Sequence, residues 1–177
     1  MLWWVLTACP REEPEQGETA AVYVTEPCEA CDGECADTTG DPGGGQHVEG
    51  DLDYSESPPL GGNHNGCWAA WGVHEETVAP ENWIHNLEHG GVVVLVSCPG
   101  EGCVDDRLAL AEWVLTLPEG RALLTDYAGA PMPYTLVSWG HRLELGCVDL
   151  VEMQAFFDAN EGQAPEDVIA EPKASCL

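Results

Sequence analysis

The sequence predicts an α+β domain, in which one small mixed or antiparallel sheet is covered by two or three helices. Three observations support this fold class. Helical and strand-like apolar patterns alternate with short connections over residues 46–164, the chain of 177 residues is 44% apolar, and nine cysteines indicate a disulfide-rich fold. This length and apolar content suit a single compact domain with one core.

The predicted elements follow from local patterns. A helix is expected over residues 78–89, because Pro80 suits a first turn and Gly90 suits a C-terminal stop. The apolar run that follows, residues 91–97, is typical of a buried strand. The remaining elements are a helix over 105–117, strands over 122–127, 134–139 and 142–145, and an amphipathic helix over 150–160.

The two ends of the chain differ in composition from this domain. Residues 1–9 form a short apolar run that ends Leu6-Thr7-Ala8-Cys9 and resembles a bacterial lipobox, in which the cysteine is lipidated. The run is short and lacks a positively charged start, so an ordinary apolar N-terminus is the alternative. Residues 10–45 are predicted to be an acidic, cysteine-containing tether, and residues 165–177 an acidic tail.

These features predict an exported lipoprotein, anchored at the bacterial cell envelope through Cys9 and facing the periplasm or the exterior. No other segment approaches the apolar length of a membrane span. The chain has 5 Lys+Arg against 32 Asp+Glu, a formal net charge of −27. This balance argues against nucleic-acid binding, because phosphate neutralisation needs basic residues, and it favours an adaptation to solubility or salt.

The cysteines favour disulfide bonds over a metal cluster. If Cys9 carries lipid, eight cysteines remain, and an even number in an exported chain fits a disulfide framework. Cys98 and Cys103 form the best local pair, because the Pro-Gly and Gly between them allow a sharp turn. The run of three cysteines at 28, 31 and 35 resembles part of an iron–sulfur motif, but an exported setting favours disulfides there too.

A histidine cluster is the predicted functional site. On a helix, His85 and His89 share one face, and two neutral imidazoles at this spacing can bind one ion. A third ligand must come from elsewhere, with His64 the first choice and His47 the next. Three imidazoles suit zinc or copper, whereas calcium and magnesium prefer oxygen ligands. Glu88 is expected to accept an N–H from a ligand histidine and so orient it.

Two other functions stay open. The sequence His85-Asn86-Leu87-Glu88-His89 matches His-x-x-Glu-His, the inverted zinc-protease motif, in which the glutamate activates water. Glu88 would be catalytic only in such a metal-dependent hydrolase, and the Gly-Gly that follows ends the helix early for one. The other alternative is a disulfide-stapled envelope domain that binds no metal and interacts with another protein or has a structural role. Its histidines would then only make hydrogen bonds in loops.

Several motifs in order resemble the bacterial domain of unknown function family 3105. They are Gln46-His47, Tyr54, Pro58-Pro59-Leu60-Gly61-Gly62-Asn63-His64, Trp71-Gly72-Val73, His85-Asn86-Leu87-Glu88-His89-Gly90-Gly91, and Ser138-Trp139-Gly140. The family shows Pro-Pro-Thr-Ser-Gly-x-His, from which Leu60-Gly61 departs. The resemblance covers about residues 46–160 and implies membrane-anchored or exported relatives. It supports the histidines and Glu88 as site residues and implies no reaction.

Overall fold

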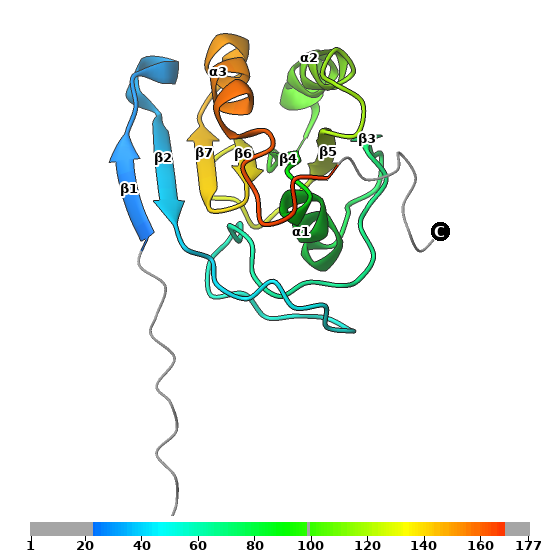
Figure 1. Ribbon diagram of the computed structural model, residues 1–177. Helices are drawn as coiled ribbons and strands as arrows, with labels where there is room; N and C mark the ends of the chain where they lie inside the picture. Colours follow the sequence, from blue (N-terminus) through cyan, green and yellow to red (C-terminus); the bar gives the residue numbers. More distant parts are fainter. Residues whose placement is uncertain (1–22, 99, 169–177) are drawn as a thin grey trace, which may run out of the picture.

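A computed structural model of the protein describes residues 23–98 and 100–168. Its centre is one seven-stranded sheet with the strand order β1-β2-β7-β6-β4-β5-β3 (Figure 1). The strands are β1 Tyr23–Pro27, β2 Cys35–Gly40, β3 Gly72–Val73, β4 Val92–Val96, β5 Ala122–Asp126, β6 Tyr134–Ser138 and β7 His141–Leu145. The sheet is mixed, since β5 runs parallel to β3 and β4 while the other described pairs are antiparallel.

Helices cover both faces of the sheet. Helices α2, Val104–Val114, and α3, Leu150–Asn160, pack on one face, and α1, Pro80–Glu88, packs on the other. Strand β4 explains this arrangement, because its side chains alternate between the two cores. Val92, Val94 and Val96 face α2 and α3, while Val93 and Leu95 face α1. Two short 3₁₀ turns, Ala30–Gly33 and Glu101–Cys103, complete the described elements.

The predicted α+β class is confirmed, and each element predicted over residues 78–160 is present within a few residues of its expected bounds. The sheet is larger than predicted. Strands β1 and β2 form a hairpin that pairs with β7, with Cys35 opposite Leu145 and Thr39 opposite His141. Part of the predicted tether, residues 23–40, is therefore an edge of the sheet.

The hairpin escaped prediction because its strands are polar. Thr38 is buried in β2, and its hydroxyl lies 3.0 Å from that of Thr25 on β1. Threonine suits strands but leaves no apolar alternation in the sequence. A disulfide between Cys31 and Cys147, 116 residues apart, holds the hairpin to the end of β7.

The cysteines of the described residues form disulfides rather than a metal cluster. Cys28 is bonded to Cys35, and Cys98 to Cys103, the local pair expected from the sequence. Cys67 is disulfide-bonded as well. The lipobox-like segment with Cys9 lies outside the described residues. Among the helices that are described, none combines the length and apolar character needed to cross a membrane.

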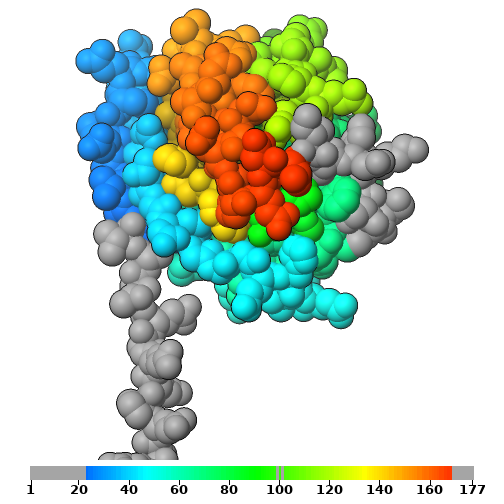
Figure 2. Space-filling model, viewed as in Figure 1, coloured from blue at the N-terminus to red at the C-terminus, as the bar shows by residue number. Residues whose placement is uncertain are grey.

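Residues 161–168, here named the C-terminal strap, follow α3 and cross the end of α1 (Figure 1). The backbone N–H of Glu166 donates to the carbonyl of Glu88 at 3.0 Å. In Figure 2 the strap, in red, lies on the surface beside the cyan loop segment. The predicted boundary at residue 164 is therefore too early, because part of the expected tail packs against the domain.

Candidate metal centre

Helix α1 carries the polar centre of the molecule. It begins at Pro80, and six consecutive residues of it, 83 to 88, are buried. Trp83, Ile84 and Leu87 pack on the sheet in the core shared with β4. His85 and Glu88 are also buried, with 3% and 6% of their surfaces exposed. A surface helix exposes its polar side to solvent. Because the polar residues of α1 are buried, a second segment of the chain must cover them.

The loop between β2 and β3 supplies this layer. Asn86 fixes it to the helix, because its amide accepts from the N–H of Ala69 at 2.9 Å and donates to the carbonyl of Ala69 at 3.0 Å. Two stretches of the loop also pair with each other at a parallel bridge between His47 and His64. The backbone thus brings both loop histidines over α1.

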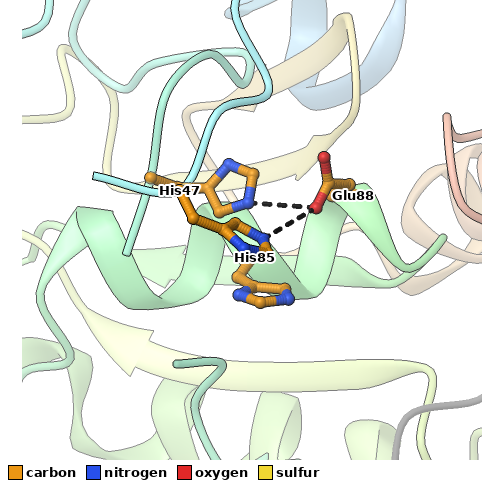
Figure 3. Close-up of side chains that lie close together, drawn as sticks. His47, His85 and Glu88 are labelled. Atoms are coloured by element: carbon orange, nitrogen blue, oxygen red, sulfur yellow. Dashed lines mark hydrogen bonds and ion pairs between the residues drawn. The ribbon is translucent and has the colours of Figure 1, made fainter. Parts of the chain in front are cut away.

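The four side chains of the centre are His47, His64, His85 and Glu88, each with a donor atom within 4.8 Å of those of the others. The Nε2 atom of His64 lies 3.0 Å from Oε2 of Glu88, and Nε2 of His47 lies 3.6 Å from the same oxygen. Figure 3 shows His47 directed at the carboxylate and His85 on the same helix as Glu88. The rings of His64 and His85 are 4.9 Å apart between centroids.

Backbone carbonyls set the tautomers of two of these histidines. Nδ1 of His64 lies 2.9 Å from the carbonyl oxygen of Gly62, and Nδ1 of His85 lies 2.8 Å from that of Asn65. A carbonyl can only accept, so in each ring Nδ1 carries the proton. In the neutral rings Nε2 therefore presents a lone pair toward the centre. Metal-binding histidines commonly have this arrangement, in which the other ring nitrogen donates to a carbonyl.

His89 ends α1 and lies at the edge of the centre. Its Nε2 is 3.1 Å from Nε2 of His85 and 3.7 Å from Oε2 of Glu166 on the C-terminal strap. A second potential metal-binding group consists of Glu88, His89 and Glu166, again with donor atoms within 4.8 Å of one another. His85 and His89 are thus neighbours, as the sequence predicts, but they belong to two different groups of possible ligands.

Burial favours the neutral form of His85 and His89. It lowers the pKa of His85 from 6.5 to about 4, an effect that the hydrogen bond to Asn65 opposes and the neighbouring histidines reinforce. Burial also lowers the pKa of His89, against the opposing influence of Glu166 and Glu88. Both rings are therefore uncharged at neutral pH, which is the form that binds a metal ion.

The structure brings together all five residues selected from the sequence for this site. Glu88 contacts the two histidines of the loop. Its carboxylate is in direct contact with His64 and His47, two of the predicted ligands. The remaining two histidines, 74 and 141, belong to neither group of possible ligands among the described residues.

Glu166 is the site residue that the sequence did not reveal. It stands in Pro165-Glu166-Asp167, which resembles every other acidic stretch of this chain. Only the path of the strap across α1 distinguishes it. The aromatic ring of Trp68 is a second unexpected neighbour, 5.5 Å between centroids from His85 and from His89.

Comparison with known proteins agrees with the resemblance noted in the sequence. A family described as "Protein of unknown function (DUF3105)" matches residues 47–176. All of the histidines and carboxylates of the two groups lie in this range, whereas the β1–β2 hairpin precedes it. No curated protein and no solved structure matches the chain. Since the match covers most of the sequence, the chain belongs to the DUF3105 family of proteins of unknown function.

Proposed function

We propose that this domain binds a transition-metal ion, zinc or copper, through His47, His64, His85 and Glu88. One observation carries the proposal. The Nε2 atom of His64, whose other ring nitrogen donates to the carbonyl of Gly62, faces Oε2 of Glu88 at 3.0 Å. Without a cation between them, two hydrogen-bond acceptors would face each other in a buried place, which is costly.

A metal ion would resolve this conflict and engage the other donors as well. Nε2 of His85 presents a second lone pair, and His47 completes a set of three imidazoles and one carboxylate. Among the ion pairs of the described residues, Glu88 has histidines as partners and no Lys or Arg. The rival explanation is a proton on His64, which would make a buried imidazolium–carboxylate pair.

The donor set determines the class of metal. Imidazole nitrogens suit zinc and copper, whereas an all-oxygen shell suits magnesium and calcium. Four protein donors fill a tetrahedral zinc site, and this favours binding over catalysis, because hydrolytic zinc sites keep a position open for water. Glu88, the base expected in a hydrolase, is itself one of the donors. A metal-free envelope domain stays the alternative if no metal is retained.

The proposed location is outside the cytosol, at the bacterial cell envelope with Cys9 as the lipid anchor. The disulfides of the described residues support export, because such bonds persist in oxidising compartments. Release of the protein from membranes by removal of the N-terminal lipid, and its retention in the soluble fraction after Cys9→Ala, would test the anchor.

Metal content tests the proposal. The protein is produced in an oxidising compartment, its affinity tag is removed, and zinc and copper are quantified by elemental mass spectrometry after dialysis against each ion. We expect metal in the wild type, and at least one equivalent less of it in His64→Ala and His85→Ala. His141→Ala is the matched control, since it removes an imidazole outside the cluster and should keep the metal. A metal-free wild type, or equal retention in all variants, would refute the proposal.

A further inference from the structure

We propose that the domain binds a second metal ion, held by Glu88, His89 and Glu166, with the carboxylate of Glu88 shared between the two ions. The donor atoms of these three residues lie within 4.8 Å of one another, as do those of the first group. This inference rests on the proposed function, because one carboxylate belongs to both sites. Carboxylates that join two ions are typical of two-metal centres.

His89 is a buried side chain whose hydrogen bonding is incomplete. Its side chain is 10% exposed, and its Nδ1 is buried with no hydrogen-bond partner among the described residues. No partner therefore fixes which ring nitrogen carries the proton. Nε2 is directed into the group, 3.7 Å from Oε2 of Glu166 and 3.1 Å from Nε2 of His85, and it can offer a lone pair there.

Acceptors outnumber protons around His89. Nε2 of His85 carries no proton in the neutral ring, because Nδ1 donates to the carbonyl of Asn65. Ionised Glu88 and Glu166 also only accept. In its neutral form His89 can supply one Nε2 proton at most to all three groups. With the first ion on His85 and Glu88, the carboxylate of Glu166 is the acceptor left beside His89, and a second cation would engage it together with Nε2 of His89 and the shared carboxylate of Glu88.

The backbone of the C-terminal strap is held at this place. Besides the hydrogen bond from Glu166 to Glu88, the N–H of Gly162 donates to the carbonyl of Gly90 at 2.9 Å. Gly90 has a φ of +82°, and a Cβ there would come within 3.0 Å of the Cα of Gly162. Glycine at position 90 thus serves both the end of α1 and the close approach of the strap.

Arg121 provides the second attachment of the strap. Its guanidinium donates to the carbonyl of His89 at 3.1 Å, and it forms ion pairs with Asp167 at 3.0 Å and Glu161 at 3.1 Å. These acids neutralise the arginine, so its charge is already matched by the strap. Among the described residues, Glu166 pairs with His89 and with no Lys or Arg. Both attachments keep Glu166, an exposed residue, at the edge of the centre.

The donors distinguish the second ion from the first. The first group has three imidazoles and one carboxylate, whereas the second has one imidazole and two carboxylates. Carboxylate donors suit manganese, and a site with fewer imidazoles binds copper less well than one with three. We therefore expect the second site to accept zinc and manganese and to bind copper less tightly than the first.

Stoichiometry of zinc binding tests this inference. Tag-free, metal-stripped protein with its disulfides intact is titrated with zinc against a chromophoric chelator, and bound zinc is counted by elemental analysis. The variants are Glu166→Gln and, as a control with the same change of charge at an exposed position of α2, Glu112→Gln. Thermal unfolding of the metal-free proteins shows that each variant is folded.

The wild type and Glu112→Gln are expected to bind two zinc ions each, and Glu166→Gln one. The second ion should bind at least about tenfold more weakly after the substitution, since even an outer partner of a metal ligand is worth roughly 10–100-fold. One zinc ion in all three proteins would overturn the second site and leave the proposed function intact. Equal losses in both variants would show a general charge effect and also overturn it. No bound zinc in the wild type would refute both proposals.

Discussion

The two faces of the sheet are built differently. On the face covered by α2 and α3, the buried residues are almost all apolar, and Met153, Phe156 and Phe157 of α3 are typical of it. On the other face, α1 buries an imidazole, an amide and a carboxylate next to its apolar residues. The first face is an ordinary apolar core. The second face buries polar groups that lose their hydration, at a place where a bound ligand would replace the lost interactions.

This contrast separates stability from binding. Apolar burial stabilises a fold by about 25 cal/mol per Å² of surface removed from water. Burial of a carboxylate without a full set of partners costs free energy instead. Glu88 and His64 are therefore expected to weaken the metal-free domain, and their presence is explained if a bound cation offsets this cost. Substitutions on the face covered by α2 and α3 should therefore change stability, and substitutions on the face covered by α1 should change metal binding.

The largest effect is expected on the apolar face. Phe157→Ala would leave a cavity beside α3, because this ring is 3% exposed in the core. We expect a loss of about 3–5 kcal/mol in the free energy of unfolding, measured by denaturant titration of the metal-free protein. Metal content of the folded fraction should be unchanged. A loss of metal in this folded fraction, with stability retained, would contradict the division between the faces.

A smaller loss of stability is expected at acidic pH, through the buried histidines on the face covered by α1. The pKa of His85 is about 4 in the folded protein and 6.5 without burial, so the unfolded state takes up more protons between these values. The contribution of neutral His85 is therefore fully present above about pH 6.5 and is lost as the pH falls towards 4. His89 acts in the same direction.

The check is the free energy of unfolding of metal-free protein between about pH 7 and 5, a range chosen above the titration of most carboxylates. His85→Gln should show a shallower pH dependence than the wild type, because it removes one group that titrates between the two states. Identical slopes for the two proteins would mean that His85 is not buried as a neutral ring.

The smallest effect on stability is expected from Glu88→Gln, which changes metal binding most. Glutamine keeps the shape of the side chain, and its amide can donate to the lone pair of His64 that the carboxylate opposes. We expect the metal-free variant to unfold within about 1 kcal/mol of the wild type, or to be more stable. Its affinity for zinc should fall strongly. A large loss of stability without metal would show that the carboxylate is part of a stabilising ion pair with His64.

The sequence revealed the core elements and most of the site for clear physical reasons. The run of valines in β4 and the pair of histidines on α1 are local patterns, with periods that identify a buried strand and a helix face. The loop that carries His64 was also predictable, because a pair of imidazoles needs further donors and few histidines were available.

Other features depend on contacts that no local pattern encodes. Strand β2 lies between β1 and β7 and buries Thr38, and its place beside β7 depends on pairing across more than a hundred residues. Glu166 differs from the other acidic residues only in where the strap lies, and that position is set by Arg121 and by the backbone of α1. The balance of donors and acceptors at Glu88 likewise emerges only when loop and helix meet.

X-ray absorption at the zinc edge of zinc-loaded protein tests the central claim most directly. With one equivalent of zinc, we expect nearest neighbours that are nitrogen and oxygen only, at about 2.0–2.2 Å, with outer scattering from several imidazole rings. His64→Ala should reduce that outer scattering. Sulfur neighbours at about 2.3 Å, or a shell of oxygen without imidazole, would contradict the claim that this centre is formed by the loop histidines and α1.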